Sequence, residues 1–521
     1  MQQLSGLDSA FLYTETPNQP MHIGSLLICD PSTAPGGAVR FKDIIEHFTR
    51  AAERIPYMRR RLIEVPFNAD FPYWINDASF DPEFHIRHIA LPKPGDWRQL
   101  CIQVARLHSR ALDRNRPLWE IHVIEGLDNV EGVPPGCFAY LSKVHHACID
   151  GVASTEAYIA TSSSSPDNAD VPVEAGWQPD KVPKPEELLF LAMQNALTRP
   201  YRYAEFLSRQ MPLLKDLNST LGANQLRAST APAPRIRFNG RVSAARVYDG
   251  VTFDFEEIRA MKAAIGGTVN DLMLAVCSGA LRRYLLEKDE LPDQSLVSFC
   301  PINTRDPNSP ANQGNVVSAM LVPLRTDIAD VKARAYAICD ETRGAKELAN
   351  AVGAKAMVEA AEFVSPNLAI LGARLAAEHG LANMQQPTFN CVTTNVPGSW
   401  KPLYCAGAEI LHDFGTGPVV DSNGLFHAIK SYRGKMTIGI TACREMMPDP
   451  ANYTDCLRAS YDELQSALLG KGRKSGKKTR RKTAGTPAPG GKRHSPRKAV
   501  KSAPAKARTK PRRTRSKRSK Q

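Results

Sequence analysis

The stretch "GCFAYLSKVHHACIDG", from Gly136 to Gly151, alternates as a β-strand does and then ends in two histidines, a cysteine and an Asp-Gly pair. Successive side chains of a strand point to opposite faces of its sheet. The alternation predicts one face with Phe138, Tyr140, Ser142, Val144 and His146, and another with Cys137, Ala139, Leu141, Lys143 and His145. We therefore expect the two adjacent imidazoles to point in opposite directions.

This opposition bears on the chemistry of the motif. Two opposed imidazoles do not bind one metal ion, and no nearby cluster of Cys, His or Asp supplies further ligands, so we predict no metal site. A nucleophilic Cys148 needs a lowered pKa and a base beside it, whereas His146 lies only two residues away on the same chain. Packing in a tight turn is the favoured interpretation of Cys148. The alternative is that the whole stretch is a strand end with no chemical role. Asp150, three residues after His146 and followed by Gly151, makes that alternative weaker than it is for an isolated histidine.

Composition predicts a large globular body and a separate basic end. The chain has 521 residues, of which 42% are hydrophobic, enough material for two domains. Residues 471–521 hold 22 Lys and Arg and no Asp or Glu, whereas the rest holds 45 basic and 53 acidic residues. The net charge of +14 is therefore carried by this tail, which also has few large apolar side chains and is predicted to be disordered.

Cysteine usage and hydropathy predict a cytoplasmic protein. Eleven cysteines stand singly without zinc-site spacing, as expected in a reducing compartment. The N-terminus lacks the basic region and apolar core of a signal peptide. No stretch reaches the run of about 18 apolar residues that a membrane-spanning helix needs. We expect any membrane contact to be peripheral.

The body divides into two α/β halves. Period-two runs predict strands at 21–31, 118–127, 296–303, 316–324 and 435–443, and amphipathic runs predict helices at 41–55, 97–112 and 268–287. Residues 161–187, rich in Ser, Pro and Asp, predict a linker, followed at 186–214 by helices broken at Pro200. We place domains at residues 1–160 and 246–470, connecting material at 161–245 and the tail at 471–521.

Several motifs in a fixed order narrow the class of protein. "HHACIDG" matches the HHxxxDG motif of the chloramphenicol-acetyltransferase-like, CoA-dependent acyltransferases, which peptide-synthetase condensation domains share. The other segments are "LSGLDSAFLYTETPNQPMHIGSL", "RPLWEIHVIEGL", "GGTVNDLMLAVCSGALRRYL", "GNVVSAMLVPL" and "TTNVPGS". Together, over residues 3–468, they resemble the bacterial wax ester synthase/acyl-CoA:diacylglycerol acyltransferase family, and within it the actinobacterial triacylglycerol synthases.

The resemblance implies a fold and an activity. It implies two chloramphenicol-acetyltransferase-like α/β domains with the active site in a channel between them. The implied reaction moves a fatty acyl group from acyl-CoA to diacylglycerol, or to a long-chain alcohol to give a wax ester. It needs no cofactor, since acyl-CoA is a substrate. His146 would act as general base on the acceptor hydroxyl. Asp150 would fix the loop through an arginine, with Arg305 as the candidate, and Gly151 would leave room for substrate.

Other residues match the family motifs with structural alternatives beside them. His145 is expected to support the site from the opposite face of the strand. Asn270 either caps its helix or stabilises charge near the active site, two roles that are compatible, and Asp271 belongs to the same motif. Pro117 and Trp119 of "PLW" are interpreted mainly as packing residues.

Partners and competing functions follow from the helices at 186–214 and from the tail. The helices combine apolar residues with arginines, which suits either an interfacial helix or a packed inter-domain helix. The tail suits an anionic membrane or lipid-inclusion surface at the cytoplasmic side of the inner membrane, while nucleic acid or a solubilising role stays open. The alternatives to the leading function are an acyltransferase of this fold with another acceptor, and a noncatalytic membrane- or nucleoid-associated scaffold.

Overall fold

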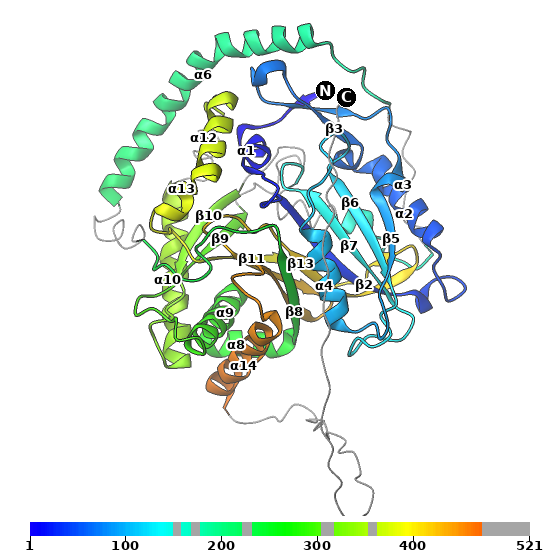
Figure 1. The fold of residues 1–521 in the computed structure, drawn as a ribbon. Coiled ribbons are helices and arrows are strands. Elements are labelled where there is room, and N and C mark those ends of the chain that lie inside the picture. Colours follow the sequence, from blue (N-terminus) through cyan, green and yellow to red (C-terminus); the bar gives the residue numbers. More distant parts are fainter. Residues whose placement is uncertain (150–157, 168–177, 221–231, 304–316, 353–361, 471–521) are drawn as a thin grey trace, which may run out of the picture. The chain divides into compact units, whose positions relative to one another are not determined.

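The computed structural model describes residues 1–149, 158–167, 178–220, 232–303, 317–352 and 362–470, which belong to one compact unit (Figure 1). The predicted tail lies outside the described residues. Of the predicted site residues, Asp150, Gly151 and Arg305 also lie outside them.

The first six-stranded sheet contains the strand that ends in the two histidines. Its strands are, in spatial order, β12 (Tyr404–Cys405), β13 (Ala408–Thr416), β2 (His22–Asp30), β7 (Phe138–His145), β6 (Trp119–Glu125) and β5 (Ile86–Ala90). Neighbours are antiparallel except for the parallel pair β5 and β6. Two of the six strands come from the C-terminal half of the chain.

The second six-stranded sheet belongs entirely to the C-terminal half. Its order is β10 (Val317–Pro323), β9 (Val297–Asn303), β11 (Cys391–Pro397), β14 (Leu425–Tyr432), β15 (Lys435–Cys443) and β8 (Arg246–Asp254). The central pairs β9–β11 and β11–β14 are parallel, and the others are antiparallel. A small sheet of β1 (Gln2–Gln3), β4 (Tyr73–Asn76) and β3 (Arg60–Ile63) completes the described strands.

Helices cover these sheets. The helices are α1 (Gly6–Thr14), α2 (Phe41–Arg54), α3 (Pro82–His85), α4 (Trp97–His108), α6 (Pro185–Thr220), α8 (Phe255–Ile265), α9 (Val269–Leu286), α10 (Val331–Val352), α12 (Pro366–His379), α13 (Leu381–Met384) and α14 (Pro450–Leu469). The predicted helices at 41–55, 97–112 and 268–287 and the predicted strands are confirmed within a few residues at each end. The mixed α/β class is confirmed as well.

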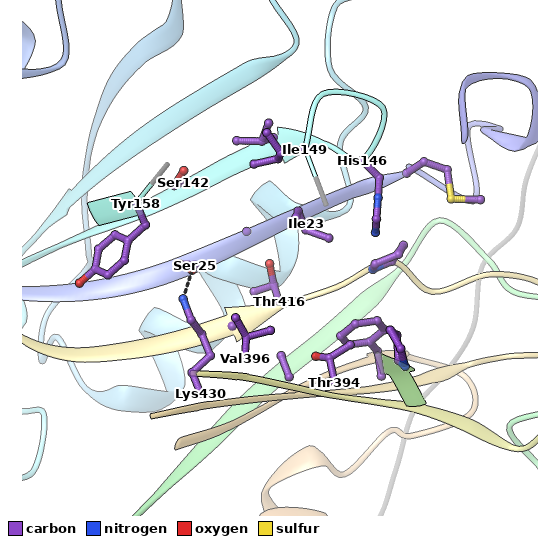
Figure 2. A pocket seen from close by; sticks show the side chains of 18 of the residues that line it. Ile23, Ser25, Ser142, His146, Ile149, Tyr158, Thr394, Val396, Thr416 and Lys430 are labelled. Atoms are coloured by element: carbon purple, nitrogen blue, oxygen red, sulfur yellow. Dashed lines mark hydrogen bonds between the residues drawn. The ribbon is translucent and has the colours of Figure 1, made fainter. Parts of the chain in front are cut away.

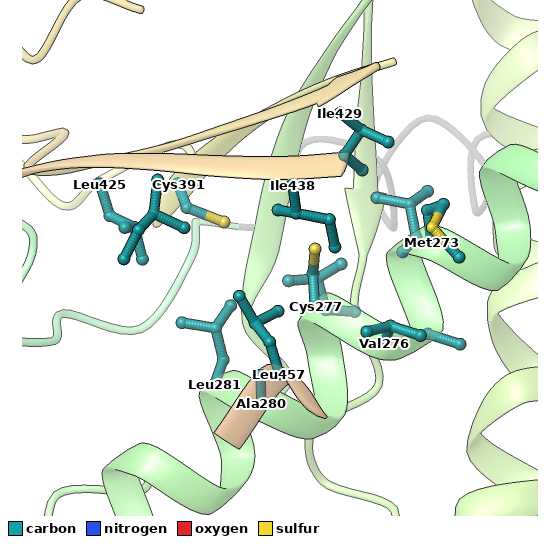
Figure 3. Packing of buried hydrophobic residues seen from close by; sticks show 14 of the residues in the cluster. Met273, Val276, Cys277, Ala280, Leu281, Cys391, Leu425, Ile429, Ile438 and Leu457 are labelled. Carbon is teal, nitrogen blue, oxygen red and sulfur yellow. The ribbon is translucent and has the colours of Figure 1, made fainter. Parts of the chain in front are cut away.

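The largest core lies between the second sheet and α9. Met273, Cys277 and Leu281 of this helix pack against the strands, with Leu457 of α14 beside them (Figure 3). Thirteen of the residues from Asp271 to Leu285 are buried, so α9 is covered on nearly all sides. The all-round apolar sequence of 272–281 dictates this central position, because such a helix has no face suited to water.

A contact between α4 and β8 joins the two sheets. Trp97 Nε1 donates to Asp249 Oδ1 over 2.7 Å, and the indole ring packs on Phe414 of β13. Helix α4 begins with a capping box in which Asp96 accepts from the Gln99 backbone over 2.9 Å. The two halves of the chain are thus joined by the contacts of α4 as well as by the strands β12 and β13 in the first sheet.

The predicted break at Pro200 is wrong, because α6 runs without interruption from Pro185 to Thr220. Proline removes one helical hydrogen bond, a loss that tertiary contacts can offset. Before the proline, Asn195 Nδ2 donates to Asp70 Oδ2 over 2.6 Å, and Arg199 pairs with the same carboxylate. After it, the Tyr203 ring packs on Phe363. Anchors on both sides hold the helix axis through Pro200.

Candidate active site

A cavity of about 480 Å³ lies between the two large sheets. Side chains of β2, β6 and β7 form one wall, and side chains of β9, β11 and β14 form the other. The lining is mainly apolar. It also includes the polar and charged residues Ser25, Ser142, His146, Thr161, Thr394, Thr416, Asn423 and Lys430. A largely apolar cavity with a few polar groups is the usual form of a site for a small molecule with much hydrocarbon.

His146 lies directly after β7 and points into this cavity (Figure 2). Its backbone N–H donates to the carbonyl oxygen of Met21 over 2.8 Å. The Phe11 ring of α1 stacks on the imidazole, with ring centroids 4.1 Å apart and planes inclined by 12°. Two contacts from the N-terminal segment, more than 100 residues before His146, therefore fix the position and the plane of this ring.

His145 faces away from the cavity, as the alternation predicts. Its side chain is buried, and its Nδ1 accepts from the backbone N–H of Ala147 over 3.1 Å. Its Nε2 lies 3.6 Å from Glu15 Oε1, and Glu15 pairs with Arg114 over 2.7 Å. Burial opposes the charge on Glu15, but His145 and Arg114 outweigh it and lower the pKa of this carboxyl to about 2.

Glu15 also reaches the His146 side of the strand. Its Oε1 accepts from the backbone N–H of Met21 over 3.1 Å, and Met21 in turn accepts from the N–H of His146. The predicted supporting role of His145 thus has a physical route through Glu15 and the Met21 backbone. Sequence reasoning missed Glu15, because nothing in its local pattern marks a partner 130 residues away.

A second polar group is buried on the same face as His145. Lys143 Nζ donates to the Arg110 carbonyl over 2.8 Å and lies 3.4 Å from Glu120. Burial lowers the pKa of Lys143, and the attraction of Glu120 opposes this effect. The face opposite the cavity therefore holds ionic groups that stabilise the strand end, while the cavity face holds uncharged residues and His146.

Cys148 behaves as a packed thiol. Burial raises the pKa of its thiol well above the usual range, and its backbone N–H donates to the His145 carbonyl over 2.9 Å. The side chain contacts two of the apolar clusters. A protonated thiol in a turn is a poor nucleophile, which favours the packing interpretation.

Asn270 and Asp271 occupy the first turn of α9. The cap of this helix is Thr268 and not Asn270, because the Thr268 side chain accepts from the Asp271 N–H and Asp271 Oδ2 accepts from the Thr268 N–H. Asp271 Oδ1 also accepts from Thr342 of α10 over 2.8 Å. Asp271 therefore ties helices together.

The structure does not bring Asn270 to the cavity wall. Its Oδ1 lies 3.5 Å from Nδ2 of Asn395, on β11. Thr394 and Val396, the neighbours of Asn395, line the cavity, so Asn395 itself points to the opposite, helix-covered face of the sheet. The sequence analysis expects both His146 and Asn270 near the active site. His146 lines the cavity, whereas Asn270 lies behind one of its walls.

Trp119 combines packing with a place in the cavity wall. It is buried, its Nε1 donates to the Met58 carbonyl over 2.6 Å, and its ring stacks on His85 at 4.5 Å. Pro117 accepts from the Trp119 backbone N–H over 2.9 Å. The expected packing role is visible in these contacts, and the indole also lines the cavity.

The sequence analysis did not predict the polar groups elsewhere in and beside the cavity. Lys430 of β14 pairs with Asp413 over 2.6 Å and donates to Ser25 Oγ over 2.8 Å (Figure 2). Single Lys, Asp and Ser residues on separate strands give no motif. Among the described residues, no group of three or more His, Cys, Asp or Glu could hold a metal ion.

Comparison with known proteins identifies the family. The sequence pattern described as "Wax ester synthase/diacylglycerol acyltransferase catalytic domain" matches residues 4–273, and that of the "WS/DGAT C-terminal domain" matches residues 313–465. The chain belongs to this family. The expectation of an acyltransferase enzyme is thereby confirmed.

Curated relatives and solved structures agree. A Mycobacterium tuberculosis (strain ATCC 25618 / H37Rv) protein named as a diacylglycerol O-acyltransferase is 32% identical over 471 residues, 89% of this chain and 90% of that protein. A second protein of that strain, named tgs2, is 31% identical over 462 residues, 88% of this chain and 98% of that protein.

The solved wax ester synthase/diacylglycerol acyltransferase from Marinobacter aquaeolei VT8 superposes with a TM-score of 0.62 at 28% identity, covering 90% of this chain and 100% of that one. The first condensation domain of the calcium-dependent antibiotic synthetase gives 0.54 at 13% identity, covering 90% and 96%. The predicted chloramphenicol-acetyltransferase-like fold is confirmed.

One finding concerns membranes. Among the described helices, none alone is long and apolar enough to cross a bilayer, and α8 with α9 meets that length and composition only as a pair bent by 98°.

Proposed function

We propose that this protein transfers a fatty acyl group from acyl-CoA to the free hydroxyl of diacylglycerol, with His146 as general base. Membership of the family and the names of its curated relatives support the reaction. The observation that carries the assignment of the base is the position of His146 in the wall of an apolar cavity, with its ring plane held by Phe11.

The proposed chemistry uses one imidazole twice. His146 removes the proton of the acceptor hydroxyl as its oxygen attacks the thioester carbonyl carbon, since an alcohol at neutral pH is otherwise a weak nucleophile. The carbon–sulfur bond then breaks, and the imidazolium returns the proton to the departing CoA thiolate. Such direct transfer needs no acyl-enzyme, in agreement with the raised pKa of Cys148.

A competition assay tests the reaction and ranks the acceptors. Purified protein would receive palmitoyl-CoA with equal amounts of diacylglycerol and 1-hexadecanol, and free CoA, triacylglycerol and wax ester would be measured. We expect CoA release with triacylglycerol as a product. Wax ester alone would favour the fatty alcohol as acceptor, and no CoA release with either acceptor would contradict the proposed function.

We also propose that α6 and α12 form an interfacial surface for lipid. Helix α6 packs through Leu188 and Ala192. Its other side exposes Phe190, Met193, Leu197 and Tyr201 at helical spacing, and the exposed fractions of Leu197 and Tyr201 are 75% and 77%. Leu368, Leu371 and Leu375 of α12 are exposed in the same way. A water-insoluble acceptor must be taken from such an interface.

The basic tail at 471–521 is proposed to strengthen this contact through anionic headgroups, on the basis of its composition alone. In the double variant Leu197→Glu and Tyr201→Glu, the fraction of protein that sediments with phosphatidylglycerol vesicles should fall several-fold. The melting temperature should be preserved, because neither side chain is buried. Deleting the tail should weaken vesicle binding and retain turnover in detergent. Lost turnover in detergent would instead show that the tail is needed for catalysis and not only for contact with the membrane.

A further inference from the structure

One end of the cavity lies between the first sheet and helix α2, and we call it the deep arm. Its lining consists of the buried residues Leu27, Phe48, Met58, Trp119, Ile121 and Tyr140, which belong to one apolar cluster. By contrast, Phe299, Pro301 and Thr394 of the opposite wall are only partly buried. The deep arm is thus the most sheltered part of the cavity.

Strand β7 orders the wall of the deep arm by distance from His146. Val144, Ser142 and Tyr140 precede His146 at intervals of two residues, and all of them line the cavity on the same face. At the usual rise of a strand, Ser142 lies about 13 Å and Tyr140 about 20 Å from His146 along β7. The deep arm therefore extends away from the proposed base along the strand that precedes it.

An aromatic pair closes the far end of the deep arm. The rings of Phe48 and Tyr140 pack edge to face, with centroids 5.6 Å apart and planes inclined by 72°. Each residue is only 2% exposed, so the pair forms a wall and not a second mouth. An apolar channel that begins beside a base and is closed at its other end suits one hydrocarbon chain whose reactive carbon is terminal.

Ser142 is the small residue midway along the deep arm. In the strand register it pairs with Ser25 on one side and with Ile121 on the other. Lys430 donates to Ser25 across the cavity, so the β2 side of Ser142 is polar and charged, whereas the β6 side is apolar. Because a hydrocarbon chain offers a buried ammonium group no hydrogen bond, its favourable path toward Tyr140 runs over Ser142 and Ile121.

We propose that the deep arm holds the hydrocarbon chain of the acyl-CoA, and that the small side chain of Ser142 is what lets long chains pass. The inference rests on the proposed acyltransferase function. The thioester carbonyl must lie beside His146 to react. The first carbons of the chain then contact Val144, the middle ones pass Ser142, and the last ones reach Phe48 and Tyr140.

The competing occupant of the deep arm is a chain of the acceptor. Leu7 and Phe11 of α1 also line the cavity, and Phe11 stacks on His146. Helix α1 packs against α12, which carries exposed leucines of the proposed lipid surface (Figure 1). An acceptor taken from lipid therefore reaches His146 past α1, whereas the deep arm leads away from His146 along β7. The arm is left to the acyl chain.

The test measures how Ser142→Leu changes the preference for acyl chain length. The ratio of kcat/KM for palmitoyl-CoA to that for octanoyl-CoA is measured with one diacylglycerol in the same detergent. An octanoyl chain ends before Ser142, whereas a palmitoyl chain must pass it. Ser142→Leu should lower this ratio by about tenfold or more, because the leucine occupies volume that several methylene groups need. The melting temperature should stay near that of the wild type, since Ser142 faces the cavity.

Phe48→Leu should act in the opposite direction, because it removes part of the closed end. The ratio of kcat/KM for docosanoyl-CoA to that for palmitoyl-CoA should rise several-fold. Such a ratio does not depend on the amount of folded protein, so the loss of stability expected for a buried aromatic residue does not obscure it. Should Ser142→Leu fail to fold, this ratio decides the question, and an unchanged value would overturn the inference.

Thr394→Leu is the matched control, because Thr394 lines the opposite wall and the exchange likewise replaces a hydroxyl side chain by leucine (Figure 2). Its ratio of palmitoyl to octanoyl turnover should stay that of the wild type. An unchanged ratio in folded Ser142→Leu, or an equal fall in Thr394→Leu, would overturn the inference. So would a Ser142→Leu variant that alters only the preference among acceptors of different chain length. Failure of the wild type to release CoA from any acyl-CoA would instead contradict the proposed function.

Discussion

His145 and His146 are neighbours in sequence but lie on opposite faces of one strand end. His146 projects into an apolar cavity between two sheets, against the Phe11 ring. His145 is buried on the other face, beside the Glu15–Arg114 ion pair. The motif HHxxxDG thus combines a group in contact with the cavity and a group that stabilises the backbone holding it.

The contrast shows how the two faces of one strand separate the proposed base from the groups that stabilise its backbone. A base needs access to substrate, so it must face open volume. The position of that base needs strong partners, which would be costly inside an apolar cavity. Period-two alternation solves both requirements in adjacent residues, because the ionic groups stand behind the strand and the base stands in front. Variants at the two histidines and at Glu15 should separate these roles.

Replacing His146 should have the largest effect on turnover. His146→Ala removes the proposed base, so kcat should fall about 10²- to 10⁴-fold, the usual contribution of general base catalysis. Steady-state CoA release and the melting temperature would both be measured. The fold should persist, because the ring is only partly buried and the backbone bond to Met21 is kept. A variant with turnover close to that of the wild type would show that His146 is not the base.

Replacing Glu15 should produce the reverse pattern. Glu15→Ala leaves Arg114 without its carboxylate and removes the acceptor for the Met21 N–H. We expect the free energy of unfolding to fall by about 2–3 kcal/mol, as for other partly buried ion pairs that lose one partner. Urea denaturation measures this change. The loss of kcat per folded molecule should be much smaller than for His146→Ala, and equal losses would place Glu15 in the chemistry itself.

The pH dependence of stability should sharpen the same comparison. The pKa of Glu15 is lowered from 4.5 to about 2 in the folded protein, so its stabilising contribution is present above pH 4.5 and is lost as the pH falls toward 2. Wild-type protein should therefore lose more stability than Glu15→Gln over this acidic range. Parallel curves of unfolding free energy against pH for the two proteins would contradict the lowered pKa.

Much of this arrangement follows from the local sequence. The faces of 137–146 were predictable because successive side chains of any strand point to opposite faces of its sheet. The ordered motifs identified the fold and the family. The role of Thr268 as the cap of α9, in place of Asn270, could also have been predicted, since "TVND" carries a threonine three residues before an acidic residue.

Contacts between distant segments could not be predicted in this way. Glu15 meets His145, and Lys430 meets Ser25, only after separate strands and helices pack together. The continuity of α6 through Pro200 depends on Asp70 and Phe363, each more than 100 residues away in sequence. The passage of β12 and β13 into the first sheet likewise has no local signal, because any strand pattern fits either sheet.

Cys148 should show the smallest effect of all. It stands two residues beyond His146, yet burial raises the pKa of its thiol well above neutrality and its side chain packs in apolar clusters. Cys148→Ala should keep kcat within about twofold and lower stability by about 1 kcal/mol, the effect of a small lost side chain. Mass spectrometry of wild-type protein quenched during turnover should detect no acylated Cys148. Transfer would proceed through the cysteine if Cys148→Ala were as inactive as His146→Ala, or if an acylated thiol accumulated. The groups that react would then include the turn after the strand as well as the cavity face of the strand.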